Sequence, residues 1–377
     1  MIRFNQSLIA LLSLVVVGAL VQRGSAIAQT AYINEIKGKV ELKRKTWSEF
    51  RAVSRVGTQL SDGDQLRRAS SAVVIIACPN GKKQPVRIAE ERLGLKQICP
   101  QWKVVISKGP PPLISIGGVN AQIPYLISPR RTLLLSNTPT LRWHPVPGAT
   151  QYTVQVITPK GTVWQTQVKE PQVTYPSQPA LQPGIPYSVV IQTNTGKSSQ
   201  SETSTGTEFI LLQGTEAKAV QAEVQQLLQG DLSDEVKALK LAAYYRNYRV
   251  PQSSAYGLSE KTANGYRLSA EAIAALETLI TQGKRSPLIY RTLGDLYLQT
   301  GVMNPAENAY LREIENIQSF EDLEEWSLSL YGLGELYEVS QNLQQALIFY
   351  TQAKAGFALL RDERAEALSR AIARLRR

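Results

Sequence analysis

A pattern in the C-terminal part of the chain repeats after about 40 residues, and it constrains the fold more than any other feature. The first copy reads Tyr290-x-x-Leu293-Gly294-x-x-Tyr297, followed by Ala306 and Tyr310. The second reads Leu330-x-x-Leu333-Gly334-x-x-Tyr337, followed by Ala346, Tyr350 and Ala353. Spacings of three and four residues predict amphipathic helices, and each glycine would let two helices approach closely. Such units bury their apolar stripes only against one another, so we expect stacked helical hairpins.

This pattern resembles the tetratricopeptide repeat, a two-helix unit of about 34 residues. The clearest units span residues 287–320 and 327–360, and we expect the extra residues between them at 320–325. An incomplete unit precedes them, because Ala272, Leu276 and Leu279 stand 34 residues before Ala306, Tyr310 and Glu313. Residues 362–376 are expected to form a closing amphipathic helix. The resemblance implies an all-α repeat domain over residues 215–377.

A tetratricopeptide stack would present the first helices of its units along one concave face. We expect six residues of two successive units to be exposed there: Arg291, Asp295, Gln299, Tyr331, Glu335 and Glu338. The resemblance implies that this face holds an extended peptide or a partner helix. An ordinary solvated helix face is the alternative.

Residues 29–115 carry short period-two patterns typical of half-buried strands. Val40 and Leu42 alternate with charged residues, and turn sequences such as residues 61–64 separate the runs. The region resembles the FecR-like β domain, through Gly38-Lys39-Val40, Val56-Gly57-Thr58-Gln59-Leu60, Gly63-Asp64-Gln65-Leu66 and Ser71-Ala72-Val73-Val74. The resemblance implies a periplasmic β module used for sensing or binding.

A second β region spans residues 128–213, after a proline run at 110–112 and an expected linker over residues 116–127. Its L-x-W and Y-x-V-x-V segments, with Leu181-x-Pro183-Gly184-x-x-Tyr187, resemble a fibronectin type III or immunoglobulin-like sandwich. The resemblance implies that Trp143 and Tyr187 are core residues and that the Tyr187 phenol bonds to upstream backbone. The alternative is that Trp143, Tyr152 and Trp164 are exposed and stack on sugar rings. The expected fold class is therefore multidomain: two small all-β domains followed by an all-α repeat.

The N-terminal residues 1–28 read as a secretory leader. Arg3 precedes an apolar run over residues 8–21, and small residues at Ala26 and Ala28 suit cleavage after Ala28. An uncleaved membrane tether is the alternative. No later segment is apolar enough to span a bilayer, so we expect a periplasmic or secreted protein without a transmembrane span after cleavage.

Cys78 and Cys99 are the two cysteines of the chain. In an oxidising compartment, two cysteines 21 residues apart in one domain favour a structural disulfide. Buried free thiols and a redox pair are the alternatives, although no C-x-x-C spacing is present.

The basic balance of the chain belongs to its first domain. Formal charge is +9 over residues 29–127, +3 over 128–214 and −3 over 215–377. Seven cations near strand ends and turns suggest contact with an anionic envelope polymer or lipid headgroups: Lys43, Arg44, Lys45, Arg67, Arg68, Lys82 and Lys83. Solubilising surface charge is the alternative, and export disfavours nucleic acid as a partner.

Catalytic chemistry is poorly supported by the sequence. One histidine excludes mechanisms that need two imidazoles, and no phosphate loop, dinucleotide fingerprint or nucleophile turn is present. We therefore expect no catalytic residues, no metal site and no cofactor. The sequence favours a non-enzymatic exported scaffold that docks a protein or peptide on its repeat face. The alternative function is a ligand sensor whose β domains bind a carbohydrate or small molecule while the repeats relay occupancy.

Overall fold

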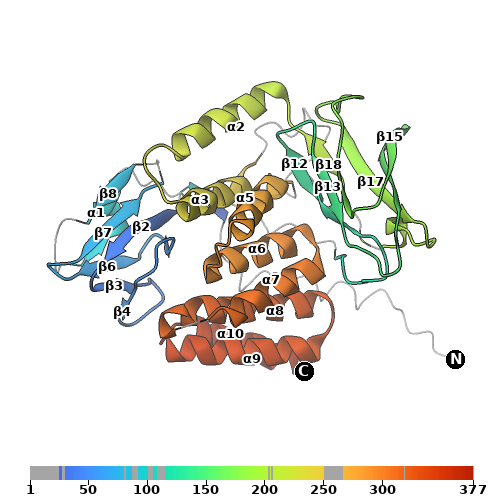
Figure 1. Ribbon diagram of the computed structural model, residues 1–377. Helices are drawn as coiled ribbons and strands as arrows, with labels where there is room; N and C mark the ends of the chain where they lie inside the picture. Colours follow the sequence, from blue (N-terminus) through green and yellow to red (C-terminus); the bar gives the residue numbers. More distant parts are fainter. Residues whose placement is uncertain are drawn as a thin grey trace.

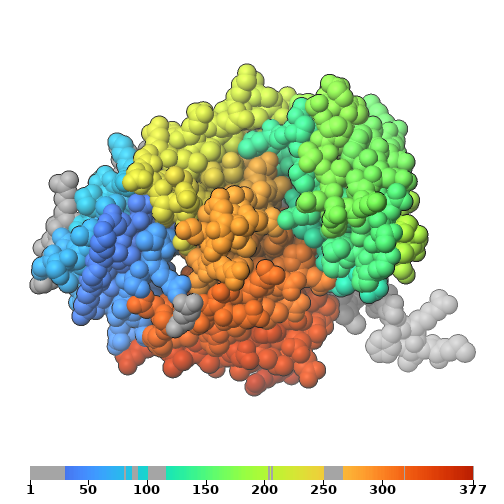
Figure 2. Space-filling model, in the orientation of Figure 1, coloured from blue at the N-terminus to red at the C-terminus, as the bar shows by residue number. Residues whose placement is uncertain are grey.

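A computed structural model describes residues 25–27, 30–79, 82–86, 92–100, 105–107, 116–202, 204, 207–249, 266–317 and 319–376. The chain forms β sheets as far as Leu211 and helices from Gly214 onward, which confirms the predicted order of β regions followed by a helical region. The helices lie in the middle of the molecule, with one β unit on each side (Figure 1). Figure 2 shows the three parts packed against one another.

The first β unit (residues 30–100) consists of two four-stranded antiparallel sheets. One has the order β5 (Gln59–Leu60), β2 (Ala31–Lys37), β7 (Val73–Ala77) and β8 (Lys83–Pro85). The other has the order β4 (Arg51–Ala52), β3 (Val40–Lys43), β6 (Gln65–Arg68) and β9 (Leu93–Gly94), and the short α1 (Leu95–Ile98) follows it. The alternation predicted around Val40 is present, because Val40 and Leu42 are buried while Glu41 and Lys43 are half-buried.

A separate two-stranded sheet pairs β1 (Ser25–Ile27) with β10 (Val105–Ser107). β1 lies within the segment predicted to be a leader. Residues 1–24 and 28 of that segment lie outside the described residues.

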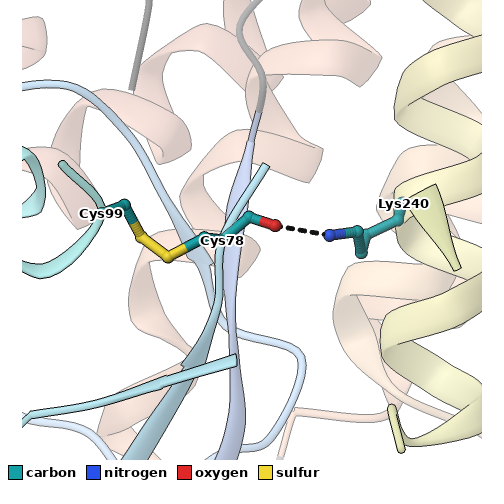
Figure 3. Close-up of a disulfide and its surroundings, with 3 residues drawn as sticks. All are labelled: Cys78, Cys99 and Lys240. Carbon is teal, nitrogen blue, oxygen red and sulfur yellow. Dashed lines mark hydrogen bonds between the residues drawn. A yellow bond between two sulfur atoms is a disulfide. The ribbon is translucent and has the colours of Figure 1, made fainter. Parts of the chain in front are cut away.

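The predicted disulfide is present. Cys78, directly after β7, and Cys99, directly after α1, are bonded with their Cα atoms 5.8 Å apart, and both are buried (Figure 3). The backbone carbonyl of Cys78 accepts a hydrogen bond of 2.7 Å from the Lys240 ammonium, which extends from the helical region. Burial lowers the pKa of Lys240 to about 8. The disulfide therefore braces the strand through which the first β unit contacts the helices.

The second β unit, here the sandwich unit (residues 126–211), has a three-stranded and a five-stranded sheet. The first has the order β11 (Leu126–Ser128), β13 (Thr140–Trp143) and β16 (Gln172–Thr174). The second has the order β12 (Thr132–Leu134), β18 (Phe209–Leu211), β17 (Pro186–Thr193), β14 (Tyr152–Thr158) and β15 (Gly161–Val168). β12 and β18 are parallel, and the other described pairs of this unit are antiparallel.

The aromatic residues of the sandwich unit form its core. Trp143, Tyr152 and Tyr187 are all buried, so the expectation that Trp143 and Tyr187 are core residues is confirmed. The Tyr187 hydroxyl accepts a 2.7 Å hydrogen bond from the backbone N–H of Gln182, which confirms the predicted bond to upstream backbone. Trp164 is half-buried and packs edge-on against Tyr175.

The helical region begins with α2 (Gly214–Leu227) and continues as antiparallel pairs. Its helices are α3 (Asp234–Asn247), α5 (Ser269–Thr281), α6 (Pro287–Thr300), α7 (Met303–Glu315), α8 (Leu323–Val339), α9 (Leu343–Leu359) and α10 (Arg364–Leu375). The closest pairings are α3 with α5, α6 with α7, and α8 with α9, and α10 packs on α9. Leu368, Ala371 and Ile372 are the buried residues of α10, as a closing amphipathic helix requires.

The two glycines of the repeated pattern act as predicted. A Cβ placed on Gly294 would lie 2.5 Å from the Tyr310 ring, and a Cβ on Gly334 would lie 2.5 Å from Cε1 of Tyr350. The two helices of each hairpin can therefore approach this closely only at a residue without a side chain. Ala306 and Ala346 are fully buried beside these contacts.

The extra residues of the second hairpin do not form a simple insertion at 320–325. Residues 320–322 form the 3₁₀ turn η4 (Phe320–Asp322), and Leu323 to Glu325 belong to the first turn of α8. α8 and α9 each have 17 residues, whereas α6 has 14 and α7 has 13. Most of the added length is therefore helical. No described helix is both long and apolar enough to cross a membrane.

Candidate functional site

The first β unit is joined to the helical region by a network of buried charges. Arg44, after β3, bonds to Asp64 of its own unit at 2.7 Å and to Glu324 of α8 at 2.8 Å. Arg364 of α10 bonds to the other oxygen of Glu324 at 2.9 Å. Burial alone would raise the pKa of Glu324, but Arg44 and Arg364 hold it below its ordinary value. The network is a structural junction between residues that are far apart in sequence.

Asp362 extends this junction. Its side chain accepts hydrogen bonds of 3.0 Å from the Trp47 indole and the Thr46 hydroxyl, and it also pairs with Arg364. Arg55 pairs with Asp322 of η4 at 2.7 Å. Positive charge from the first β unit thus meets acidic residues at the N-terminal ends of α8 and α10, where negative charge is favourable.

This junction changes the interpretation of the basic run. Arg44 is largely buried rather than displayed, Arg67 pairs with Glu41, and Arg68 donates hydrogen bonds to four backbone carbonyls. Lys83 donates a hydrogen bond to the Asp231 carbonyl. Four of the cations expected on an anionic-surface patch are therefore paired or hydrogen-bonded within the protein: Arg44, Arg67, Arg68 and Lys83. Binding to an anionic surface stays a prediction for the rest, of which Lys45 is exposed, Lys43 is half-buried and Lys82 has a partner within the protein.

A pocket of about 60 Å³ lies at the same junction, between the first β unit and the beginnings of α6 and α8. It is lined by apolar residues such as Trp47 and Leu288 and by paired ions such as Arg44, Arg55 and Glu324. An engineered cavity of roughly 150 Å³ binds benzene. This pocket has less than half that volume, and the arginines that line it are already paired with carboxylates, so it gives the ligand-sensor function no support.

The six residues expected on the concave repeat face lie on α6 and α8, but their exposure differs from expectation. Arg291 is buried, at 7% exposure, so the prediction that it is exposed was wrong. It pairs with Asp295 at 3.0 Å and with Glu325 of α8, because a guanidinium between two helices is stable only when its charge is matched. Asp295, Gln299, Tyr331, Glu335 and Glu338 are half-buried.

Two carboxylates of this face are held rigidly by neighbouring helices. Asp295 accepts a 3.0 Å hydrogen bond from the Tyr310 hydroxyl and lies 3.5 Å from Arg246 of α3. Glu338 accepts a 2.8 Å hydrogen bond from Tyr350 and pairs with Arg374 of α10. The same arrangement thus occurs in both hairpins: an acid on the first helix, a tyrosine from the second and an arginine from an adjacent helix.

Arg246 and Arg374 belong to this face although the sequence analysis did not assign them to it. Each lies in the last turn of its helix, where basic residues are common because they oppose the helix dipole. Because this preference alone explains their positions, the sequence does not indicate that Arg246 also pairs with Asp295 and Arg374 with Glu338. The sequence offered one signal: Arg246 lies in the helix pair before the two hairpins carrying the acids, and Arg374 lies in the helix after them.

The sandwich unit contacts the opposite ends of the helices. Arg142 pairs with Glu277 of α5 at 2.9 Å, and Glu277 also accepts a hydrogen bond from Tyr297 of α6. Arg130 is buried, pairs with Glu202 at 2.9 Å and donates to the Thr300 carbonyl. The first β unit therefore contacts the N-terminal ends of α8 and α10, and the sandwich unit contacts the C-terminal ends of α5 and α6. Asp295 lies in the middle of α6, and Glu338 lies in the last turn of α8.

The segment expected to be a linker is part of this packing. The carbonyls of Gly117 and Gly118 accept hydrogen bonds from Met303 and Asn304, at the start of α7. Tyr125 and Ile123 are buried, and the Tyr125 ring stacks on His144 at 4.8 Å. Residues 116–127 thus connect the sandwich unit to the helices through specific contacts rather than as a free spacer.

One buried acid in the repeat has no obvious structural use. Glu313 of α7 is fully buried where the neighbouring hairpins have Leu279 and Ala353, and neither of its carboxyl oxygens has a hydrogen-bond partner among the described residues. Burial raises its pKa to about 8, and the nearby carboxylates Glu325 and Asp322 add to this effect. The Ser329 hydroxyl and Arg291 act in the opposite direction.

Replacing this acid should stabilise the protein at alkaline pH. The pKa of Glu313 is higher in the folded than in the unfolded chain, so folding retains a proton and its stability falls as pH rises from about 4.5 to about 8. We expect Glu313→Leu to raise the free energy of unfolding by about 1–2 kcal/mol at pH 8 and by less at pH 5. Urea unfolding at both values measures this. Glu315→Gln, on the exposed side of the same helix, is the control and should show the same change of unfolding free energy with pH as wild type. If Glu313→Leu raised the free energy of unfolding equally at both pH values, the buried carboxyl would not be the cause.

No group of three or more histidine, cysteine, aspartate or glutamate side chains in the described ranges is arranged to hold a metal ion. Comparison with known proteins gave no match to a protein-family model and none to a curated protein sequence.

Proposed function

We propose that the protein is a non-enzymatic, exported scaffold that docks an extended peptide or a partner helix on the face formed by α6 and α8. The proposed domains are a FecR-like unit, a fibronectin-like sandwich and a tetratricopeptide-type repeat. The strand order of the sandwich unit supports the second resemblance, since one three-stranded sheet faces a larger sheet and a tyrosine bonds back at the turn into β17. The close Gly–Tyr contacts repeated in two hairpins support the third.

The observation that carries the docking proposal is the preorganisation of Asp295 and Glu338. Each carboxylate is half-buried and fixed by a tyrosine and at least one arginine, so little conformational entropy is lost when a ligand binds beside it. Each carboxylate has two oxygens and can accept further hydrogen bonds. A peptide with backbone N–H groups or cationic side chains could add to both sites across neighbouring hairpins.

Export is proposed from the disulfide as well as from the leader pattern. Disulfides persist in oxidising compartments and are rare in the cytosol. The bond between Cys78 and Cys99 also lies directly beside the contact with Lys240, so it stabilises the placement of the first β unit against α3. We place the protein in the periplasm or outside the cell.

Site-specific photocrosslinking in intact cells tests the docking proposal. A photoreactive residue at Gln299, which is half-buried on this face, should capture a partner, whereas one at Thr278, exposed on α5, should not. Glu338→Gln keeps the size of the side chain and an acceptor for Tyr350, so it should fold normally. We expect it to weaken capture about 10-fold through loss of charge. Equal capture by both positions, or by wild type and Glu338→Gln, would show that this face is not the docking site.

A further inference from the structure

Arg267 is a buried cation where the sandwich unit meets the helical region. It lies just before α5, beside β12 (Figure 1), and is 4% exposed. Its backbone carbonyl accepts hydrogen bonds of 2.7 Å from the Leu133 N–H and 3.0 Å from the Thr132 hydroxyl, which fix its position. Within the described part of the chain, its guanidinium donates to the Tyr266 carbonyl at 2.8 Å and pairs with no carboxylate. The Glu208 carboxylate is bonded to the Tyr266 hydroxyl, at 3.4 Å, and not to Arg267.

Two further arginines lie beside Arg267. Arg131 directly precedes Thr132, the residue that forms a β-bridge with Arg267, so the two arginines stand at neighbouring positions of paired segments. The last turn of α3 packs against the apolar cluster that contains Tyr266, which brings Arg249 to the same place. Arg131 and Arg249 are half-buried, so this side of the group is open to solvent. We call these three residues the arginine cluster.

The charge of Arg267 is not matched by the residues that the structure describes around it. Burial, together with the positive charges of Arg249 and Arg131, lowers the pKa of Arg267 to about 10, so it is still a cation at neutral pH. Arg130 and Arg291 are buried to a similar degree, and each pairs with at least one carboxylate. A buried charge without such a partner is strongly destabilising. Arg267 therefore differs from the other two in needing an anion.

We propose that the arginine cluster binds an oxyanion of the phosphate type. Guanidinium groups match the geometry of phosphate oxygens and donate pairs of parallel hydrogen bonds to them. A phosphate has enough oxygens to accept from three arginines, whereas a carboxylate has two. Arg131 is held at a φ of 47°, a left-handed conformation that is uncommon for a residue with a side chain and that recurs at ligand clamps. The bound anion would supply the negative charge that Arg267 lacks.

Isothermal titration calorimetry of the full purified chain with inorganic phosphate, at constant ionic strength, tests this inference. We expect a Kd of about 0.1–1 mM, which is reasonable for so small a ligand. Sulfate should compete and acetate should not. Arg249→Gln should weaken binding about 10-fold by removing one charged donor. Arg312→Met, at an exposed position of α7, is the matched control and should bind like wild type.

Glycerol 3-phosphate distinguishes the two sources of a phosphate group. If it binds more tightly than inorganic phosphate, the site takes an esterified phosphate. If it binds more weakly, the site takes the free ion. Equal phosphate affinity in wild type and Arg249→Gln, or no binding of either probe at about 10 mM, would overturn the proposal.

Thermal unfolding of Arg267→Met gives a second, independent readout. Without phosphate this variant should melt at the wild-type temperature or above it, because it removes an unmatched buried charge. Phosphate at about 10 mM should raise the melting temperature of wild type by about 3 °C and leave that of Arg267→Met unchanged. If the variant melted well below wild type without phosphate, the protein itself would match the charge and the proposal would be wrong. None of these outcomes depends on whether the α6–α8 face binds a partner.

Discussion

Gly334→Ala is expected to lower the free energy of unfolding by about 2–3 kcal/mol, although alanine normally stabilises a helix relative to glycine by about 1 kcal/mol. The reason is geometric. The new methyl group would lie 2.5 Å from Cε1 of Tyr350, a ring that is itself buried and bonded to Glu338. The ring cannot move without disturbing the contact between α8 and α9, so the hairpin must open.

Gly214→Ala provides the matched control. Gly214 is the first residue of α2, no atom lies within 4 Å of a Cβ placed there, and its backbone is not in the left-handed region. This variant should be as stable as wild type or slightly more so. Urea unfolding followed by circular dichroism compares the two. If Gly334→Ala proved as stable as Gly214→Ala, close approach of the helices would not be the reason for glycine in the repeated pattern.

The parts of the fold that follow local rules could be predicted from the sequence. Gly294 and Gly334 mark close helix contacts because no other residue fits there, and that requirement produces a repeated pattern that is visible without coordinates. The resemblance to a fibronectin type III or immunoglobulin-like sandwich implied that Trp143 and Tyr187 are core residues, and both are buried. The cysteine pair could be predicted because few cysteines are present and their separation suits a short loop.

Contacts between the units could not be predicted in this way. Arg44 stands between Lys43 and Lys45 and looks like one more solvated cation, yet its partner Glu324 is 280 residues away. Arg291 occupies an exposed position of a generic hairpin, but here Glu325 of the next hairpin covers it. Ion pairs between residues so far apart in the sequence produce no periodic pattern. From a single sequence, any exposed acid could be the partner of a given arginine.

The candidate site was predicted in its location but not in its chemistry. Asp295 and Glu338 were selected for their place on the first helices of two hairpins, and the structure places both there, half-buried. The arginines that hold them, Arg246 and Arg374, come from the helices at either end of the stack. A face that reads as a row of acids is therefore a row of ion pairs, and a ligand must compete with or add to those pairs.

Replacing Arg44 should have the largest effect of the changes considered. Arg44→Met removes the cation that pairs with Asp64 and one of the two arginines that pair with Glu324, and these carboxylate side chains are 4% and 11% exposed. An uncompensated buried charge costs about 3–5 kcal/mol, so we expect a loss of about that size near neutral pH. Lys45→Met, at the next and exposed position, should change the free energy of unfolding by less than about 0.5 kcal/mol.

A neutral triple variant and hydrogen exchange can show whether Arg44→Met destabilises the protein through loss of charge or through loss of packing. Adding Glu324→Gln and Asp64→Asn to Arg44→Met leaves a neutral site of nearly the same shape, and it should recover at least half of the stability because neutral groups of similar volume replace buried ions at little cost. Hydrogen exchange should show where the damage lies. In Arg44→Met, amides near Trp47 and at the start of α8 should exchange faster, while those of the sandwich unit stay protected. If exchange instead rose uniformly in all three parts, or if the neutral triple variant were no more stable than Arg44→Met, the buried charges would not be what fixes the first β unit to the helices.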